Sequence, residues 1–281
     1  MGALISTAEL ARRLGEPSLR IADLRWRLGQ PGKGRELYRA GHIPGAVHLD
    51  IDTELAAVSG PGRHPLPSPE QCAAVLGRAG IGDSHDVVVY DDLGGAIAAR
   101  LWWMLRWLGH DQVALLDGGL PQWQGESRPL ERQPREPTPA RFTPRPRAEM
   151  TVERAQVERL RARPQVLVLD ARAAERYRGD SEPIDARAGH IPGAVNAPYQ
   201  ENLIDSSDPR FRHPNALRER YAALGADRAQ SVVCYCGSGV TACHDLFALE
   251  LAGFSGAKLY PGSWSDWSAD PGRPVATGAE P

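Results

Sequence analysis

The sequence predicts an α/β protein built from two tandem copies of one domain, each a mainly parallel sheet flanked by helices. Two observations support this fold class. The first is an internal repeat, because Gly-His-Ile-Pro-Gly-Ala-Val occurs at residues 41–47 and again at 189–195. The second is that short apolar runs alternate with helical patterns in both copies, which is typical of a buried parallel sheet covered by helices.

Further anchors repeat in the same order along the chain. Asp23 and Asp170 each end a short apolar run. The two other pairs of matching segments are residues 87–91 with 232–236 and residues 117–123 with 261–267. Anchors that recur in one order indicate a duplicated domain. We therefore assign an N-terminal domain, a Pro- and Arg-rich extended linker and a C-terminal domain to residues 1–124, 125–150 and 151–281.

Each copy is expected to contain the same elements. A polar residue opens a helix, Ser6 in the first copy and Thr151 in the second. A strand ending in Asp follows, then the Gly-His-Ile-Pro-Gly turn and a second short strand. The next strand, residues 87–90 or 231–235, leads into an apolar helix that a glycine ends, at Gly109 or Gly253. A last strand, residues 113–116 or 258–260, precedes a Gly-rich turn and a tryptophan.

Composition excludes several classes of protein. The 281 residues carry a formal net charge of −2, so there is no surplus of cations for a nucleic-acid partner. No apolar run approaches the roughly 20 residues that span a bilayer, so we expect no membrane association. The chain starts without a charged segment followed by an apolar one, and its cysteines are sparse. We therefore expect a cytoplasmic protein with reduced thiols.

The clearest candidate for chemistry is the segment Cys236-Gly237-Ser238-Gly239-Val240-Thr241, between a strand and a helix. Ligands of open α/β sheets bind at the carboxyl ends of the strands, and backbone N–H groups at such a turn converge on anions. A thiolate at the start of this loop would be stabilised by those donors and by the helix dipole, which predicts a nucleophilic Cys236. The glycines leave room for the backbone to curl around the sulfur.

Other interpretations of these cysteines stay open. Cys236 could be a small buried packing residue, which is the common role of a free cysteine. Cys234 and Cys243 are expected to pack in the core, and a zinc site formed by the three cysteines with His244 lacks familiar ligand spacing. The first copy has Asp91 where the second has Cys236. A carboxylate cannot accept or pass on sulfur, so the first copy is expected to be catalytically silent.

The tandem Gly-His-Ile-Pro-Gly domains, the Asp-Gly-Gly-Leu and Gly-Ser-Trp turns and the single cysteine loop resemble the two-domain rhodanese superfamily over essentially the whole chain. The loop is similar to that of the 3-mercaptopyruvate sulfurtransferases, whereas thiosulfate sulfurtransferases typically carry basic residues in place of Gly237 and Ser238. The resemblance implies two rhodanese-like domains. It also implies transfer of sulfane sulfur from 3-mercaptopyruvate to a thiol or cyanide through a Cys236 persulfide. Thiosulfate is the alternative donor.

The resemblance also implies roles for individual residues. Arg176 matches the family arginine that holds the substrate carboxylate, which suits a guanidinium fork. The following segment is shorter than in mercaptopyruvate enzymes, and Arg187 is the candidate for their second arginine. Asp52 and His64 match positions proposed to form a proton relay with Ser238. From the residues alone, the ordinary interpretation of Arg176 and His64 is that both are solvated surface side chains. Substrate contacts are further expected from the loop residues Gly237, Gly239, Val240 and Thr241.

No metal or organic cofactor is expected, and the expected partners are a small sulfur donor and a thiol acceptor such as a thioredoxin-like protein. Two other classes remain as alternatives. A cysteine-loop phosphatase needs five residues and then an arginine after the cysteine, and this chain has Ala242 at that position. A non-catalytic sulfur carrier or protein-binding module would not need the intact loop. His42 and His190 occupy equivalent positions in the two copies, whereas catalysis should occur in one copy only. We therefore expect both histidines to stabilise the turns.

Overall fold

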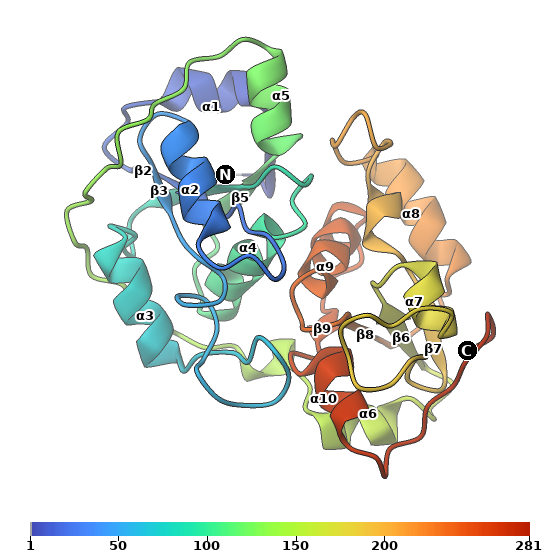
Figure 1. The fold of residues 1–281 in the computed structure, drawn as a ribbon. Helices are drawn as coiled ribbons and strands as arrows, with labels where there is room; N and C mark the ends of the chain where they lie inside the picture. The colour runs from blue at the N-terminus through green and yellow to red at the C-terminus, as the bar shows by residue number, and fades with distance from the viewer. Residues whose placement is uncertain (1) are drawn as a thin grey trace. The chain divides into compact units, whose positions relative to one another are not determined.

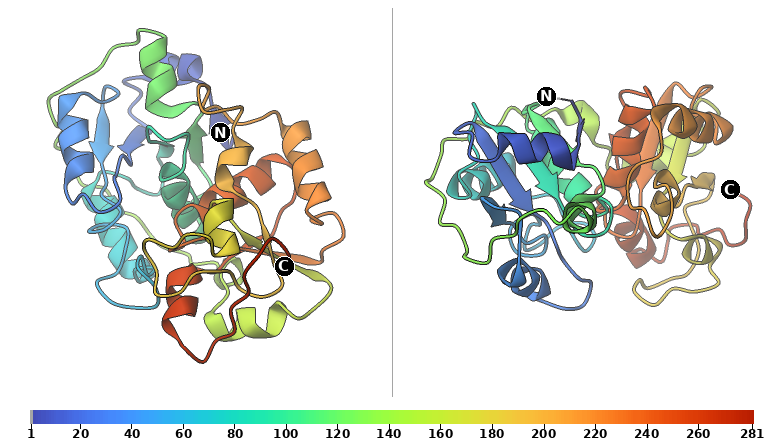
Figure 2. Two further views of the ribbon diagram at one scale, coloured as in Figure 1. Left: turned by 45° about the vertical axis from the view of Figure 1, so that its right-hand side comes forward. Right: turned by 90° about the horizontal axis from the view of Figure 1, so that it is seen from above.

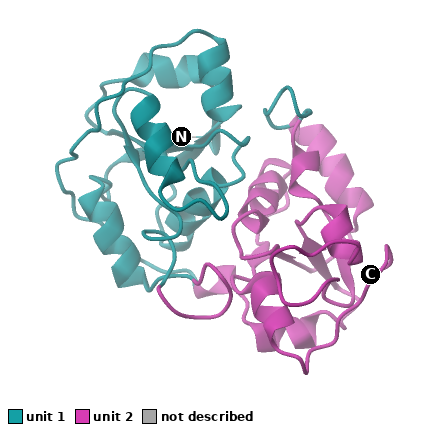
Figure 3. Cartoon of the chain, in the orientation of Figure 1, with its two compact units in different colours: residues 1–57, 66–147, 204–211 teal, residues 58–65, 148–203, 212–281 magenta. Residues whose placement is uncertain are grey.

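The computed structural model describes residues 2–281, and the chain divides into two compact units (Figures 1 and 3). Unit 1 comprises the chain up to Ala57 together with Leu66–Arg147 and Ile204–Phe211, and unit 2 comprises Val58–Pro65, Ala148–Leu203 and Arg212–Pro281. Each unit therefore includes one short segment from the other half of the sequence. The internal repeat did not predict this exchange.

Both units are built on a parallel sheet with the same strand arrangement. In unit 1 the order is β1-β5-β4-β2-β3, with β1 (Leu4–Ile5), β2 (Leu19–Asp23), β3 (Ala46–His48), β4 (Asp86–Tyr90) and β5 (Val113–Leu116). In unit 2 the order is β7-β6-β8-β9, with β6 (Val166–Asp170), β7 (Ala194–Asn196), β8 (Ser231–Tyr235) and β9 (Lys258–Leu259). The parallel sheets predicted from the sequence are confirmed.

Helices lie on both faces of each sheet (Figure 2). Unit 1 contains α1 (Thr7–Arg13), α2 (Lys33–Ala40), α3 (Pro69–Arg78), α4 (Ala98–Trp107) and α5 (Gly119–Gly125). Unit 2 contains α6 (Arg154–Leu160), α7 (Ala174–Arg178), α8 (Pro214–Ala223), α9 (Ala242–Leu251) and α10 (Ser263–Ala269), with 3₁₀ turns η1 (Ala148–Met150) and η2 (Tyr199–Asn202).

Alternating side chains on the strands pack against these helices. In β4, Val88 and Tyr90 belong to the same core cluster as Trp123 of α5. In β8, Val233 and Tyr235 belong to a core cluster with Trp264 and Trp267 of α10. The tryptophans after the Gly-rich turns are therefore core residues. Burying such large side chains contributes much of the apolar driving force for packing α5 and α10 on their sheets.

The predicted start of the first helix is confirmed in unit 1 and wrong in unit 2. Ser6 caps α1 by accepting a hydrogen bond from the backbone N–H of Glu9, as predicted. Thr151 does not begin a helix, because α6 starts at Arg154 with Glu153 as its cap. Thr151 instead forms an isolated parallel bridge with Leu259, at the sheet edge where unit 1 has β1. That correction follows from strand pairing, which the local sequence does not encode.

The Gly-His-Ile-Pro-Gly turns are fixed by the residues predicted to be structural. The buried rings of His42 and His190 stack on tyrosines, with centroids 3.8 and 3.7 Å apart, and each Nδ1 lies 2.8 Å from a backbone carbonyl oxygen. Asp170, at the end of β6, pairs with Arg172 at 2.6 Å, and Arg172 also donates to the carbonyl of Gly189. Unit 1 repeats this ion pair between Asp23 and Arg25.

The Pro- and Arg-rich segment forms no helix before η1 and runs along unit 1. Backbone hydrogen bonds fix it at intervals, from Ala140 N–H to the Gly77 carbonyl at 2.9 Å and from Arg145 N–H to the Leu108 carbonyl at 2.8 Å. It is therefore extended, as predicted, but it is packed along its length.

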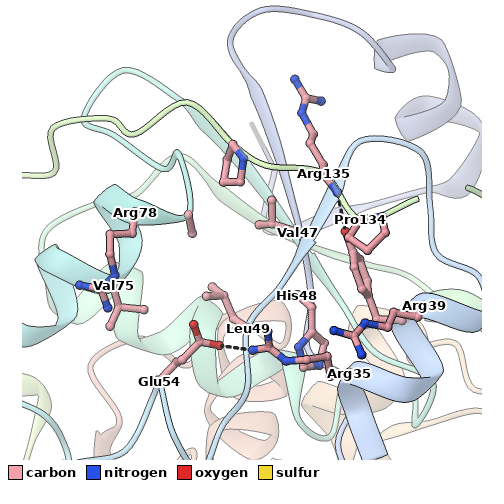
Figure 4. Close-up of a pocket in the computed structure, with 13 residues that line it drawn as sticks. Arg35, Arg39, Val47, His48, Leu49, Glu54, Val75, Arg78, Pro134 and Arg135 are labelled. Carbon is pink, nitrogen blue, oxygen red and sulfur yellow. Dashed lines mark hydrogen bonds and ion pairs between the residues drawn. The ribbon is translucent and has the colours of Figure 1, made fainter. Parts of the chain in front are cut away.

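Unit 1 contains a cavity of about 230 Å³. Its lining includes Arg35, Arg39, Arg78 and Arg135, and Arg35 lies 3.8 Å from Glu54 (Figure 4). No residue of the cysteine loop contributes to this lining. Among residues 2–281, no helix is both long and apolar enough to cross a membrane.

Candidate active site

The cysteine loop connects β8 to α9 in unit 2 and is held by the start of α10. The Cys236 N–H donates to Ser263 Oγ at 3.1 Å. In return, the N–H groups of Trp264 and Ser265 donate to the carbonyls of Cys236 and Gly237, each at 2.9 Å. Because both sides of the loop backbone are bonded to α10, the position of Cys236 is fixed by the sheet and by α10 together.

A backbone amide is directed at the sulfur of Cys236. The Gly239 N–H donates to Cys236 Sγ at 3.2 Å. Gly239 has φ +76°, and a Cβ at this position would lie 2.5 Å from the carbonyl oxygen of Pro261. Only glycine therefore fits the turn that aims this amide at the sulfur. Cys236 is buried, and the Gly239 amide gives its sulfur a hydrogen-bond donor inside the loop.

The matching loop of unit 1 holds an acidic side chain in an amide cradle. The carboxylate of Asp91 accepts hydrogen bonds from the backbone N–H groups of Leu93, Gly95, Ile97 and Ala98, at 2.7 to 2.8 Å. Burial raises the pKa of the Asp91 carboxyl, whereas these four amides act to lower it. The duplicated loop therefore directs four amides at a carboxylate in unit 1 and the Gly239 amide at a thiol in unit 2.

Ser238 and His64 meet in unit 2, as the predicted relay requires. His64 Nδ1 lies 2.7 Å from Ser238 Oγ, and both side chains are buried. His64 lies in the segment Val58–Pro65, which is fixed by a hydrogen bond from Arg63 N–H to Ser265 Oγ at 3.1 Å. Asp52 belongs to unit 1, where its carboxylate accepts a hydrogen bond from the Trp26 indole at 2.7 Å. Its place in the relay stays a prediction.

Arg176 lies beside the loop, on α7. A Cβ at Gly237 would lie 3.5 Å from Arg176 Nη1. The rest of the guanidinium is held by acidic side chains, since Nη2 donates to Glu182 at 2.7 Å and to Asp185 at 3.0 Å, and Nε donates to Glu182 at 3.2 Å. Arg176 therefore lies beside the loop with its guanidinium oriented by Glu182 and Asp185, and its role in donor binding stays a prediction.

Arg63 is a site residue that the sequence analysis missed. A Cβ at Gly237 would lie 2.8 Å from Arg63 Nη2, and Arg63 Nη1 forms an ion pair with Asp185. Burial lowers the pKa of Arg63, while the charge of Cys236 acts to raise it. The sequence did show that Arg63 is adjacent to His64. Since His64 was a predicted site residue, its neighbour could have been predicted to lie close to the site as well.

Arg187 has a different role from the one expected. Its guanidinium donates to the backbone carbonyls of Trp267, Ser268, Asp270 and Arg273, at 2.7 to 3.4 Å. These bonds occupy Nε, Nη1 and Nη2 and close the C-terminal end of α10. The expected donor-binding role does not fit this geometry. The sequence showed only that an arginine stood in the segment, and not which acceptors it would meet.

The family of the chain follows from comparison with known proteins. The family model of the Rhodanese-like domain matches residues 6–126 and 153–270. The chain belongs to the rhodanese family. It is 46% identical over 280 residues to the Probable 3-mercaptopyruvate sulfurtransferase of Pseudomonas aeruginosa, covering 98% of both chains. It is 43% identical over 286 residues to the Putative thiosulfate sulfurtransferase SseB of Mycobacterium tuberculosis, covering 98% of this chain and 97% of that protein.

The fold is also that of a solved rhodanese. The crystal structure of SseA from Escherichia coli, described as a 3-mercaptopyruvate sulfotransferase, superposes with a TM-score of 0.84 at 32% identity. The match covers 94% of this chain and 100% of SseA. The predicted rhodanese fold and family are thus confirmed, and the chain is a sulfurtransferase.

Within this rhodanese, the two units differ at the segment that supplies the acidic side chains. Tyr38 and Tyr177 are equivalent, since each stacks on the histidine of its turn and donates its hydroxyl proton to a strand carbonyl. His190 lies 13 positions after Tyr177, whereas His42 lies four positions after Tyr38. The nine additional residues carry Glu182 and Asp185, and the residue before the tyrosine is Arg176 in unit 2 but Leu37 in unit 1.

The remaining loop and cysteine residues are buried or half-buried. Val240 is buried and Thr241 is half-buried at the start of α9. Cys234 and Cys243 are fully buried, as predicted for packing residues. Burial raises the pKa of the Cys234 thiol well above its usual range, so this thiol is held protonated.

Proposed function

We propose that this sulfurtransferase moves sulfane sulfur from 3-mercaptopyruvate to a thiol acceptor through a persulfide on Cys236. The observation that carries the proposal is the amide of Gly239 directed at the Cys236 sulfur beside two guanidinium groups. The nucleophile and the charges that attract an anionic donor are therefore adjacent. The name of the relative from Pseudomonas aeruginosa supports the same donor.

The first half-reaction is a displacement at sulfur. The Cys236 thiolate attacks the sulfur of the donor, and the bond between that sulfur and C3 breaks. The electron pair of the broken bond goes to the pyruvate fragment, which leaves as its enolate and takes up a proton to become pyruvate. The outer sulfur remains on Cys236 as a persulfide. Arg176 holds the donor carboxylate, and the Gly239 amide stabilises the charged sulfur.

Ser238 and His64 handle the proton in this step. The contact of 2.7 Å between Ser238 Oγ and His64 Nδ1 suits proton transfer between the hydroxyl and the imidazole. The thiol proton of the donor is passed through this pair to the enolate carbon, so the donor sulfur is transferred without a net change in protons. Asp52 is the proposed third member, orienting His64.

The second half-reaction restores the enzyme. The thiolate of an acceptor attacks the outer sulfur of the persulfide, the bond between the two sulfurs breaks, and the Cys236 thiolate leaves. The acceptor departs as a persulfide. A thioredoxin-like protein or a low-molecular-weight thiol fills this role, and cyanide replaces it in an assay to give thiocyanate.

Thiosulfate is the second candidate donor. The Mycobacterium tuberculosis relative carries that name, and two guanidinium groups beside Gly237 would attract a dianion. The loop positions Gly237 and Ser238 are uncharged, whereas a basic residue at position 237 would collide with Arg63. The kcat/KM for each donor decides between them. A larger value for thiosulfate would replace mercaptopyruvate as the donor.

The persulfide is tested directly by mass spectrometry of the intact protein and its peptides. After exposure to 3-mercaptopyruvate, the Cys236 peptide should gain one sulfur atom and lose it again when a thiol is added. Cys236→Ser should gain no sulfur and should not turn over, while Cys72→Ser, a buried cysteine of unit 1, serves as the matched control. Sulfur transfer by Cys236→Ser would refute the mechanism.

A further inference from the structure

We propose that Arg63 is a donor-binding residue that takes the carboxylate of the sulfur donor through its Nε–Nη2 edge, while Asp185 holds the guanidinium in place. This inference rests on the proposed function, since it concerns how the same site recognises its donor. It assigns to Arg63 the second-arginine role that the geometry of Arg187 does not fit.

The donors of Arg63 are arranged so that one edge is available. Nη1 is engaged by Asp185. Nε is buried without a hydrogen-bond partner in the described part of the chain, and Nη2 lies on the side of Gly237, 2.8 Å from where a Cβ of that residue would be. A buried N–H without an acceptor is costly, and the Nε–Nη2 edge is one of the two edges through which a guanidinium binds a carboxylate bidentately. A bound carboxylate would satisfy both donors.

Arg176 cannot offer the same edge. Its Nε and Nη2 are both bonded to Glu182, and Nη2 is also bonded to Asp185. Only Nη1, directed toward Gly237, is left for a ligand. In this arrangement Arg63 supplies two N–H donors to the carboxylate of the sulfur donor, and Arg176 supplies one.

Asp185 is suited to holding Arg63. Its side chain is 4% exposed, and it bridges Arg63 to Arg176. Its own backbone N–H donates to Glu182 at 3.0 Å, and Glu182 is bonded in turn to Arg172 at 3.3 Å. Arg172 belongs to the buried ion pair with Asp170 at the end of β6. Arg63 is thus connected through buried ion pairs to the sheet.

The charges of this network leave room for an anion. Three arginines, Arg63, Arg172 and Arg176, face three carboxylates, Asp170, Glu182 and Asp185, so the network is neutral before a donor binds. A carboxylate that binds to this neutral network adds only its own single negative charge to the site. The absence of a side chain at Gly237 keeps the path to Arg63 Nη2 open.

The test uses Arg63→Lys and Arg63→Gln in the full chain, with kcat and KM for 3-mercaptopyruvate and the inhibition constant of pyruvate. Pyruvate carries the carboxylate but no transferable sulfur. Both variants should raise the KM and the pyruvate inhibition constant by roughly 10- to 100-fold, because a charged hydrogen-bonded pair is lost, while kcat changes by less than about threefold. Lysine keeps the charge but not the fork, so it should restore only part of the affinity.

Arg178→Gln is the matched control, because Arg178 is an exposed arginine on the neighbouring helix that pairs with Asp180. It should leave both constants unchanged. Gly237→Ala provides a variant that keeps Arg63, since its Cβ would push against Nη2, and it should raise the pyruvate inhibition constant in the same direction.

The outcomes separate the two proposals. Unchanged KM and pyruvate inhibition in both Arg63 variants, with normal turnover by the unsubstituted protein, would overturn the role of Arg63 alone. If the unsubstituted protein formed no persulfide with 3-mercaptopyruvate, the proposed function would fail first. A fall in kcat at constant KM would assign Arg63 to positioning His64 and would also overturn donor binding.

Discussion

At the scale of single residues, the site depends on a few short contacts between atoms from distant parts of the chain. Ser238 follows β8, whereas His64 lies 174 positions earlier in the sequence, and their polar atoms are 2.7 Å apart. Both side chains are buried, so this contact is shielded from water and is stronger than it would be at the surface. A role in proton transfer requires that the pair act as one unit.

We expect His64→Gln to lower kcat on 3-mercaptopyruvate by roughly 100-fold, because a general acid–base contributes on that scale, while KM stays within about threefold. Ser238→Ala should have a similar effect. The double variant should lose little more than either single one, since members of one relay are not additive. Steady-state kinetics of all three variants test this, and additive losses would contradict a shared relay.

Gly239 is a residue at which one added carbon atom should abolish function. Gly239→Ala must adopt φ +76° and also bring its Cβ to 2.5 Å from the Pro261 carbonyl, so the loop has to move away from the sulfur. Persulfide formation, followed by mass spectrometry, should fall by at least about 100-fold if amide stabilisation is lost.

The matched control is Gly256→Ala. Gly256 has φ +78° but nothing within 4 Å of a Cβ, so it measures the backbone strain without the collision. It should cost about 1 kcal/mol of stability and leave persulfide formation intact. Equal losses in both variants would mean that strain alone, and not loop geometry, explains the effect.

At the scale of secondary-structure elements, α10 both orients the cysteine loop and depends on Arg187. The N-terminal residues of α10 form hydrogen bonds with the backbone of the cysteine loop. Arg187 donates hydrogen bonds to backbone carbonyls in the last turn of α10 and just after it. A helix of seven residues has few internal hydrogen bonds, so these side-chain bonds supply much of its fixation.

Arg187→Gln should therefore destabilise the protein without altering donor recognition. The loss of several bonds to carbonyls predicts a decrease of about 2–4 kcal/mol in the free energy of unfolding, measured by denaturant titration. At a temperature well below the unfolding midpoint, KM for 3-mercaptopyruvate should be unchanged. A raised KM with normal stability would restore Arg187 as a donor-binding residue.

The apolar helix α9 carries a buried carboxyl that links stability to pH. Asp245 accepts hydrogen bonds from Asn202 and Tyr221 through one oxygen, while its Oδ2 has no partner among the described residues. Burial raises the pKa of this carboxyl to about 7, although Arg220 acts to lower it. The folded state therefore holds a proton here that the unfolded chain releases near pH 4.

The sign of the pH dependence follows from this raised pKa. Stability contributed by protonated Asp245 is fully present below about pH 4 and is lost as the pH rises through about 7. Asp245→Asn keeps the shape without titrating, so it should be more stable than the unsubstituted protein at pH 8, by a few kcal/mol, with the difference vanishing near pH 4. Denaturant titrations across this pH range test it; a constant difference would contradict the assignment.

At the scale of the whole molecule, the two duplicated units differ at the loop that we propose to be catalytic. Unit 1 keeps the sheet, the turn and the amide cradle, but Asp91 fills the cradle and Leu37 stands where unit 2 has Arg176. Its turn also lacks the nine residues that carry Glu182 and Asp185. The unit therefore lacks both a sulfur nucleophile and the matching arginine network.

This difference predicts that a cysteine placed in the loop of unit 1 will not give that unit sulfurtransferase activity. The double variant Asp91→Cys with Cys236→Ser should form no persulfide at residue 91 and show no turnover, because no arginine at position 37 attracts the donor. Circular dichroism should confirm that the variant is folded. Turnover by this protein would mean that the loop alone suffices, and would remove the need for the arginines of unit 2.

The sequence by itself determined the duplication, the parallel α/β architecture and the loop that holds Cys236. Local sequence patterns predict these features: apolar runs of strand length, glycines at turns that require them and a motif that occurs twice. It also showed that the two copies differ at the loop, with Asp91 in one and Cys236 at the equivalent position of the other. The turn histidines followed for the same reason, since both copies share them.

Only the tertiary structure decided which arginines lie beside the cysteine loop. The sequence does not distinguish Arg187 from Arg63, but Arg187 bonds backbone carbonyls, whereas Arg63 lies beside Gly237 with its Nε unpartnered among the described residues. The pairing of Thr151 with β9 and the transfer of Val58–Pro65 to unit 2 were equally hidden. The reason is physical: a long cationic side chain takes its role from whichever acceptors lie within reach, and distant chain segments supply them.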